Sequence, residues 1–435
     1  MSDKSISRRS GNSPSVKKGG GVSDGNKNKK LKKSSQNNAV NEHYLTIGRR
    51  LKFVRLTLLV LLVMFILSNI VINSKELSID NLTHLLRYIN IQNSDKARLS
   101  EFAIDTEGES LIGYYRNFIV VLRRNRLDIY NLNGSRTFSH TLAYSTPVLK
   151  ISDRYILAFD NGSNKMQIFN SFSRLYEYKN EYNEINPIYG AKITDKGNTV
   201  YISSERGYRS VVTVMNNSFR EIYQCGFGDK YVVDAAIDDD AKKLAVASFI
   251  GQKGDFLGEI LLYDTGDDDG YQKKIVSEGE IPLRVDFNKN GLFSLFENSL
   301  KIFDGNYEKL EDYHFLYRDV EFFNFTTEFA AIVLTEKTLG NEKNILIFDY
   351  LGDLIYSEII NADIIDIKFS QDSKALYFLT RSGLYKIDIQ ERRFELLTAE
   401  YDDTSYEIIY ADEKNIFVSG LAKVNIININ TETED

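Results

Sequence analysis

Histidine and cysteine, which often bind metals or attack substrates, are sparse in this sequence. It has four histidines, at His43, His84, His140 and His314, and none belongs to an H-x-x-x-H or H-E-x-x-H pattern. No G-x-S-x-G elbow, P-loop or C-x-x-C pair occurs. The single cysteine, Cys225, cannot form a disulfide within the chain, and we interpret it as a packed thiol rather than a nucleophile. The sequence therefore predicts no metal site, no cofactor and no nucleophilic residue.

Carboxylates are the other side chains that could do chemistry. The densest group is the run Asp-Thr-Gly-Asp-Asp-Asp-Gly at residues 264–270, and acidic residues among glycines can bind Ca²⁺ through several oxygens. Its spacing does not match an EF-hand, so we interpret it as a solvated turn. Asp234, Asp286 and Asp366 instead fall on or near strands that should line the axis of the fold derived below. Carboxylates gathered there could act as general acids and bases in a hydrolase or lyase.

These side chains must be positioned by a repeated element that fills the last three quarters of the chain. Eight short apolar runs each end in Asp or Asn, and the steps between these end residues are 39, 46, 48, 40, 45, 39 and 40 residues. A period near 40 filled with short β-like runs is typical of a propeller in which each repeat forms one blade. The end residues are Asn131, Asn170, Asn216, Asp264, Asp304, Asp349, Asp388 and Asn428.

Each repeat can be divided into four strands separated by tight turns. The second strands are the most apolar, as at 118–122, and such runs suit sheets that are covered on both faces. The eighth repeat has no fourth strand of its own, and Ser100–Thr106 before the first repeat could supply it and close the ring. We therefore predict an all-β fold, an eight-bladed β-propeller, with a seven-bladed ring as the alternative.

Two segments carry a resemblance to known families. Residues 369–378, FSQDSKALYF, resemble the F-S-x-D-G-K stretch and following apolar strand of WD40-like and TolB-like propellers, and residues 287–291, FNKNG, are a weaker copy. Residues 50–430 also resemble a family of uncharacterised Gram-positive proteins that have one transmembrane span and a propeller ectodomain. The sequence contains no Trp and so lacks the Trp-containing docking motif of quinoproteins, which argues against a quinone cofactor.

Charge and hydropathy predict a membrane anchor before the propeller. Residues 1–55 hold 14 Lys and Arg against three acids, and the uncharged run Leu56–Ile72 follows. A basic flank before an apolar run places the N-terminus in the cytoplasm. A cleaved signal peptide is the alternative, but its basic region would be too long. We expect a disordered basic tail at 1–52, a transmembrane helix at 53–74, a juxtamembrane helix and linker at 75–99, and the propeller domain at 100–435.

The tail and the segment after the span each allow more than one role. The basic residues of the tail could serve membrane topology alone or also contact anionic lipid, whereas nucleic-acid binding has no support because no aromatic residues are interleaved. Leu82, Leu85, Leu86 and Ile89 have helical spacing, which predicts a short helix that packs on the propeller or forms a dimer or partner contact.

Candidate binding residues come from the longest turns between second and third strands, Glu205–Arg209, Ile250–Gly258 and Glu336–Lys343. Equivalent turns share one face of a propeller, and binding residues are often found on projecting loops. Tolerated insertions would also explain these lengths. The candidates for contact with a ligand or partner are Arg206, Tyr208, Lys253, Phe256, Lys337 and Lys343.

Three functions are compatible with these features. The favoured hypothesis is a single-pass protein of the cell membrane whose extracytoplasmic propeller binds an envelope protein or ligand without catalysis. The alternative is a carboxylate-dependent hydrolase or lyase with its site at the propeller axis. A sensor that signals to the cytoplasm ranks last, because residues 1–50 resemble no kinase, cyclase or DNA-binding module.

Overall fold

A computed structural model describes residues 54–64, 101–103, 109–178, 186–252, 254–267, 270–316, 318–336, 342–398, 405–420 and 423–429. The chain divides into two compact units, residues 1–87 and 88–435. In the first unit, residues 54–64 form a helix whose apolar side chains are exposed. Within the described ranges, no helix combines the length and the hydropathy that a membrane crossing requires. The rest of the predicted span, the basic tail and the predicted helix after the span lie outside the described residues.

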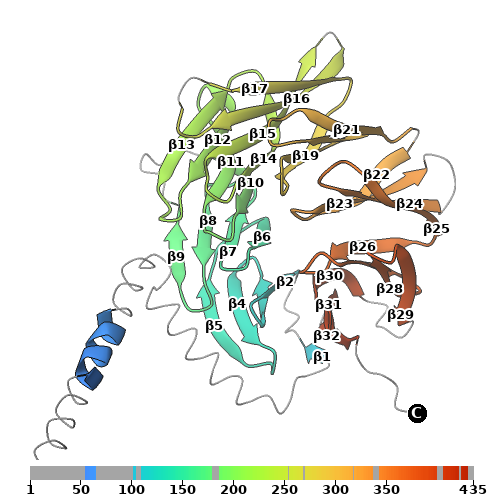
Figure 1. Cartoon of the computed structure of the whole chain (residues 1–435). Coiled ribbons are helices and arrows are strands. Elements are labelled where there is room, and N and C mark those ends of the chain that lie inside the picture. Colours follow the sequence, from blue (N-terminus) through green and yellow to red (C-terminus); the bar gives the residue numbers. More distant parts are fainter. Residues whose placement is uncertain are drawn as a thin grey trace, which may run out of the picture. The chain divides into compact units, whose positions relative to one another are not determined.

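The second unit consists of β-strands, which form eight four-stranded antiparallel sheets (Figure 1). Each of the first seven sheets is one continuous stretch of chain, and its strands pair in sequence order. Every sheet is one blade, so the ring has eight blades as predicted and not the seven of the alternative.

The blades are numbered from the first complete sheet. Blade 1 contains β2 (Leu111–Tyr115), β3 (Phe118–Leu122), β4 (Arg126–Asn131) and β5 (Arg136–Thr141), and blade 2 contains β6 (Pro147–Ile151), β7 (Ile156–Asp160), β8 (Met166–Phe169) and β9 (Arg174–Glu177). Blade 3 contains β10 (Ile188–Ile193), β11 (Thr199–Glu205), β12 (Tyr208–Met215) and β13 (Glu221–Phe227), and blade 4 contains β14 (Tyr231–Ile237), β15 (Lys243–Gln252), β16 (Asp255–Asp264) and β17 (Lys273–Glu278). Blade 5 contains β18 (Pro282–Phe287), β19 (Leu292–Phe296), β20 (Ser299–Phe303) and β21 (Lys309–His314), and blade 6 contains β22 (Arg318–Phe325), β23 (Phe329–Glu336), β24 (Glu342–Asp349) and β25 (Leu354–Asn361). Blade 7 contains β26 (Ile364–Phe369), β27 (Ala375–Thr380), β28 (Gly383–Asp388) and β29 (Arg393–Thr398), and blade 8 contains β30 (Ser405–Ala411), β31 (Asn415–Gly420), β32 (Lys423–Asn428) and β1 (Glu101–Ala103).

Ring closure uses the segment that the sequence predicts. The short strand β1 pairs antiparallel with β32, with Glu101 opposite Asn425 and Ala103 opposite Lys423. It is therefore the fourth strand of blade 8, although it precedes blade 1 in the chain. This pairing covers the edge of β32, which would otherwise present unpaired backbone groups to solvent.

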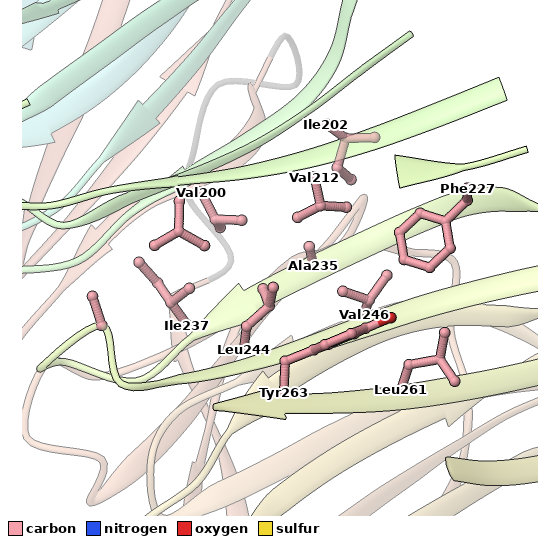
Figure 2. Packing of buried hydrophobic residues seen from close by; sticks show 12 residues of the cluster. Val200, Ile202, Val212, Phe227, Ala235, Ile237, Leu244, Val246, Leu261 and Tyr263 are labelled. Atoms are coloured by element: carbon pink, nitrogen blue, oxygen red, sulfur yellow. The ribbon is translucent and has the colours of Figure 1, made fainter. Parts of the chain in front are cut away.

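The core is divided among the junctions between blades. The described residues form eight clusters of buried apolar side chains, and each cluster joins two neighbouring blades. Figure 2 shows the junction of blades 3 and 4, where Val212 of β12 faces Ala235 of β14 and Val246 of β15. Because each sheet buries both faces in this way, its second strand can be apolar throughout. β3 of blade 1, the sequence FIVVL, is buried at all five positions.

The repeated Asp or Asn closes the turn after the third strand. Oδ1 of Asp349 accepts hydrogen bonds from the backbone N–H groups of Leu351 and Asp353, both at 2.9 Å. These bonds satisfy backbone donors that the tight turn leaves without a strand partner, which is why short Asp and Asn side chains recur there. The same kind of side-chain contact is made by Asn131, Asn170, Asn216, Asp264, Asp304 and Asp388.

Two faces of the ring are distinguished by their turns. The upper face carries the turns between second and third strands, such as residues 206–207 in blade 3, and the connections between blades. The lower face carries the turns between first and second strands, such as residues 194–198, and those between third and fourth strands. The first strands line the axis between the two faces.

Candidate functional site

The carboxylates predicted at the axis are bound by neighbouring side chains. Asp234 lies on β14 and Asp286 on β18, and Nζ of Lys192 on β10 contacts their carboxylates at 2.7 and 2.9 Å. Nε of Arg284 is 2.5 Å from Asp286 and 3.6 Å from Asp234. Burial opposes ionisation of Asp286, but the Lys192 and Arg284 cations hold the pKa of its carboxyl below the usual value. Two cations and two carboxylates from blades 3, 4 and 5 thus form one compensated cluster.

Some axial side chains also connect a first strand to the next blade. Oδ2 of Asp234 accepts a hydrogen bond of 2.9 Å from the N–H of Val285 in blade 5. In the same way, Asp366 of blade 7 accepts a bond of 2.7 Å from the N–H of Ile408 in blade 8. Burial raises the pKa of the Asp366 carboxyl, and the hydrogen bond from the Ile408 N–H opposes that shift. Asp234 and Asp366 therefore have structural roles at blade junctions.

The other candidates for chemistry have ordinary structural surroundings. Cys225 packs against the apolar cluster between blades 3 and 4, and burial raises the pKa of its thiol to about 12. The thiol is therefore protonated at neutral pH, which makes it a poor nucleophile. In the acidic run 264–270, Oδ1 of Asp264 accepts a bond from Gly266 N–H, while residues 268–269 lie outside the described residues. No group of His, Cys, Asp and Glu in the described part of the chain has a metal-binding arrangement.

Aromatic side chains gather on the upper face at blades 3 and 4. Tyr208, Tyr231 and Phe256 are each about half exposed, at 50, 49 and 47%. The ring of Phe249 connects two of them, since its centroid is 5.5 Å from that of Tyr231 and 5.7 Å from that of Phe256. The Arg209 guanidinium lies over the Tyr231 ring at 5.0 Å. We call Tyr208, Tyr231, Phe249 and Phe256 the upper-face aromatic patch.

The backbone explains why these rings are presented to solvent. β15 and β16 of blade 4 are the longest described strands, with ten residues each, and their pairing continues to Gln252 opposite Asp255. The predicted loop Ile250–Gly258 is thus a projecting hairpin that carries Phe256 beyond the body of the blade. Tyr208 lies flat against Gly226, where a Cβ atom would come within 2.7 Å of the ring.

The predicted binding residues fall into three groups. Arg206 and Tyr208 are exposed at the turn between β11 and β12, and Phe256 belongs to the same face through the blade 4 hairpin. Lys253 and Lys337 lie outside the described residues. Lys343 lies on β24 and is only 8% exposed, because its Nζ is bound to Glu321 at 2.5 Å and to Thr335 at 3.2 Å.

Sequence reasoning missed Tyr231, Phe249 and Arg209. Tyr231 begins a first strand and Phe249 lies within a second strand, so neither is on a turn. They meet because Tyr231 is directly opposite Phe249 in the β14–β15 ladder. A search for exposed aromatic residues at strand ends, in addition to turns, could have included Tyr231.

Comparison with protein families and solved structures places this fold among known propellers. The model described as "Family of unknown function (DUF5711)" matches residues 92–429, most of the chain. The chain belongs to the DUF5711 family. No curated protein matches the sequence of this DUF5711 member.

Solved structures similar to this DUF5711 propeller include the C-terminal WD40 domain of Sif2, with a TM-score of 0.53, 14% identity, and coverage of 75% of this chain and 98% of that one. A structure titled as the eukaryotic initiation factor has a TM-score of 0.51 at 13% identity and covers 75% of this chain and 87% of its own. BamB from Moraxella catarrhalis covers 76% of this chain and 99% of its own, with a TM-score of 0.47 at 9% identity. At such identities the likeness concerns the fold, and the two structures with TM-scores above 0.5 confirm the WD40-like propeller that the sequence predicts.

Proposed function

We propose that this protein is a non-catalytic scaffold that binds an envelope protein through the upper-face aromatic patch, while a membrane anchor upstream holds the propeller outside the cytoplasm. The observation that carries the binding proposal is the half exposure of Tyr208, Tyr231 and Phe256 on one face. Aromatic and arginine side chains dominate interface hot spots because they bury a large area with few rotatable bonds. The patch and the adjacent Arg209 have this composition.

Burial of the patch by a partner would be favourable for a physical reason. Tyr208 and Phe256 keep about half of their surface in water, so a partner can still remove apolar area from solvent. Phe249 packs between Tyr231 and Phe256, which restricts their rotamers before binding and lowers the entropy lost on association.

The axial contacts favour a binding role over catalysis. A general acid or base needs a carboxyl that can exchange a proton with substrate. Asp234 and Asp286 are instead paired with Lys192 and Arg284, and Asp366 accepts a backbone bond that joins two blades. A hydrolase or lyase at this axis would have to break these contacts in order to free a carboxylate.

The direction of β1 fixes the end of the ring at which the chain enters blade 8. β32 runs from Lys423, next to the upper-face turn, toward the lower face, and β1 pairs with it antiparallel. The chain therefore enters β1 at Glu101 from the lower-face end. The membrane helix that we propose at 53–74 is supported by the apolar run that follows a basic flank.

Site-specific photocrosslinking in intact cells tests the binding proposal. A photoreactive amino acid at Tyr208, Tyr231 or Phe256 should give one common adduct, whereas the same residue at Leu351, an exposed apolar position on a lower-face turn, should not. The adduct formed from Tyr231 should decrease strongly in the background Phe256→Ser and stay unchanged with Leu351→Ala. Adducts that form equally from both faces would contradict the proposal.

The anchor requires a separate experiment. Full-length protein should remain in the membrane fraction after alkaline carbonate washing, and protease added to protoplasts should digest the propeller while sparing residues 1–52. Replacement of two leucines within 56–62 by lysines should release the protein from the membrane, because charges near the middle of a span oppose insertion. Recovery of the unaltered chain in the soluble fraction would refute the anchor without affecting the binding test.

A further inference from the structure

A pocket of about 210 Å³ opens from the axis between blades 2 and 3. Its lining combines first-strand residues from four consecutive blades with second-strand residues of blades 2 and 3. It is separate from the upper-face aromatic patch, so the proposed partner binding leaves it unoccupied. The residues that line it include Val148, Lys150, Phe159, Gly190, Lys192, Val200, Ile202, Asp234 and Arg284.

Three cationic side chains line the pocket, and they differ in their ion-pair contacts. Lys192 and Arg284 are bound to the carboxylates of Asp234 and Asp286, as described above. In contrast, Lys150 on β6 has no carboxylate within ion-pair distance among the described residues. Lys150 is exposed at the axis, yet partial desolvation, followed by the nearby charges of Arg284 and Lys192, lowers the pKa of its ammonium. The carboxylates of Asp234 and Asp286 act on this pKa in the opposite direction. An anion beside Lys150 would offset these unfavourable interactions.

Other charges that face Lys150 act from a greater distance. The Lys150 charge lowers the pKa of the Glu407 carboxyl on β30, but burial and the neighbouring Asp366 outweigh this effect and raise that pKa. Lys368 on β26 is the cation that acts on both of these carboxyls. Glu407 is therefore not a contact partner that neutralises Lys150.

The lining also has apolar parts. Val148 and Phe159, which are paired in the β6–β7 ladder, contribute apolar surface at the junction of blades 2 and 3, and Val200 and Ile202 contribute it on the side of blade 4. The space exists because residue 190 is glycine, and a Cβ atom there would lie 3.3 Å from Cδ1 of Ile202. Any longer side chain at this position would enter the pocket.

We propose that this pocket binds a small organic anion whose acidic group contacts Lys150 and whose ring or short chain packs against Val148 and Phe159. The volume suits such a ligand, because an apolar cavity of about 150 Å³ is sufficient for benzene. The remaining space can hold a carboxylate or a phosphate group. These two acids share the same recognition chemistry, and the experiment below distinguishes them.

Calorimetric titration of the purified full-length chain tests the proposal with benzoate, hexanoate and phenyl phosphate as probes. Benzyl alcohol serves as a neutral compound of similar shape. At least one acid should bind saturably at millimolar concentration or below, whereas benzyl alcohol should bind at least tenfold more weakly because it lacks the charge-assisted contact. A preference between benzoate and phenyl phosphate identifies the acidic group.

Variants locate the bound acid within the chain. Lys150→Met should weaken binding tenfold or more, and Val148→Phe should abolish it by filling the pocket. Lys242→Met, at a 76% exposed lysine on the lower face, is the matched control and should bind like the unaltered chain. Thermal unfolding of each variant checks that the propeller is intact.

The proposal is overturned by any of four results. The first is the absence of saturable binding for all three acids, and the second is equal affinity of the unaltered chain for benzoate and benzyl alcohol. The third is equal affinity of Lys150→Met and Lys242→Met for the acid that binds. The fourth is retention of binding by Val148→Phe, which removes space but no charge and would place the acid outside this pocket.

Discussion

Replacement of Asp234 tests whether the axial carboxylates hold the blades together. In Asp234→Ala, the N–H of the fully buried Val285 loses its acceptor, which costs about 1–3 kcal/mol. Lys192 and Arg284 each lose one of two carboxylate partners, and because both cations are partly exposed this adds only about 1 kcal/mol. The expected loss of unfolding free energy is therefore about 2–4 kcal/mol.

This loss can be converted into a change of melting temperature. The unfolding entropy is about 2.1 cal/mol/K per residue, or about 0.7 kcal/mol/K for a propeller of roughly 330 residues. The Tm of Asp234→Ala should then fall by about 3–6 °C in differential scanning calorimetry of the full-length chain. Asp234→Asn keeps an oxygen acceptor for the Val285 N–H, so it should lose about half as much.

An exposed carboxylate provides the control. Asp229 lies on the connection before β14 and is exposed, and Asp229→Ala should stay within about 0.5 kcal/mol of the unaltered protein. If Asp234→Ala melted at the same temperature as Asp229→Ala, the assignment of a structural role would be refuted. An axial site with catalytically available carboxylates would then become the better explanation.

Three further predictions concern single positions. Burial raises the pKa of the Asp366 carboxyl above its value in the unfolded chain, so ionisation of this group destabilises the folded state as the pH rises from the unfolded pKa through the folded pKa. Asp366→Asn can still accept the hydrogen bond from Ile408 N–H and should melt at a higher temperature than the unaltered chain at neutral pH. Below about pH 4 the melting temperatures of the two proteins should converge. Parallel curves across this pH range would contradict that assignment. Asp349→Ala should lower the stability by about 1 kcal/mol in urea unfolding, whereas Asp349→Asn should be nearly neutral, and equal losses would exclude the turn contacts as the cause. Gly258→Ala should lose about 1–3 kcal/mol of unfolding free energy in the same assay, because its Cβ would lie 2.4 Å from the backbone oxygen of Glu280. In Gly251→Ala the Cβ would meet nothing within 4 Å, so this control should keep its stability. Equal effects of the two substitutions would be evidence against tight packing between Gly258 and blade 5.

The sequence was sufficient to predict the blades because the relevant signals are local and repeated. The apolar run predicted at 118–122 coincides with β3. The Asp and Asn at the ends of third strands recur because they bind the next turn, so their spacing measures the repeat. The missing fourth strand of the eighth repeat predicted that Ser100–Thr106 completes the last blade, and within that segment Glu101–Ala103 pairs with β32.

The site could be predicted only in part because it depends on pairing and on contacts between blades. The long turn predicted at Ile250–Gly258 is mostly strand, because cross-strand bonds extend the hairpin to Gln252 opposite Asp255. The contact of Lys192 with Asp286 joins residues that are 94 positions apart, and no local pattern specifies it. The axial pocket likewise depends on the absence of a side chain at Gly190 opposite Ile202.

The pairing of β1 with β32 has a consequence for the order of folding during biosynthesis. Glu101 leaves the ribosome more than 300 residues before its partner Asn425, so blade 8 cannot be completed until nearly the whole propeller sequence has been synthesised. Blades 1 to 7 are each continuous in sequence and can assemble successively on the nascent chain. Completion of the ring is therefore a late, long-range step, and a chain cut short before β32 would keep β1 unpaired and expose it to quality-control proteases.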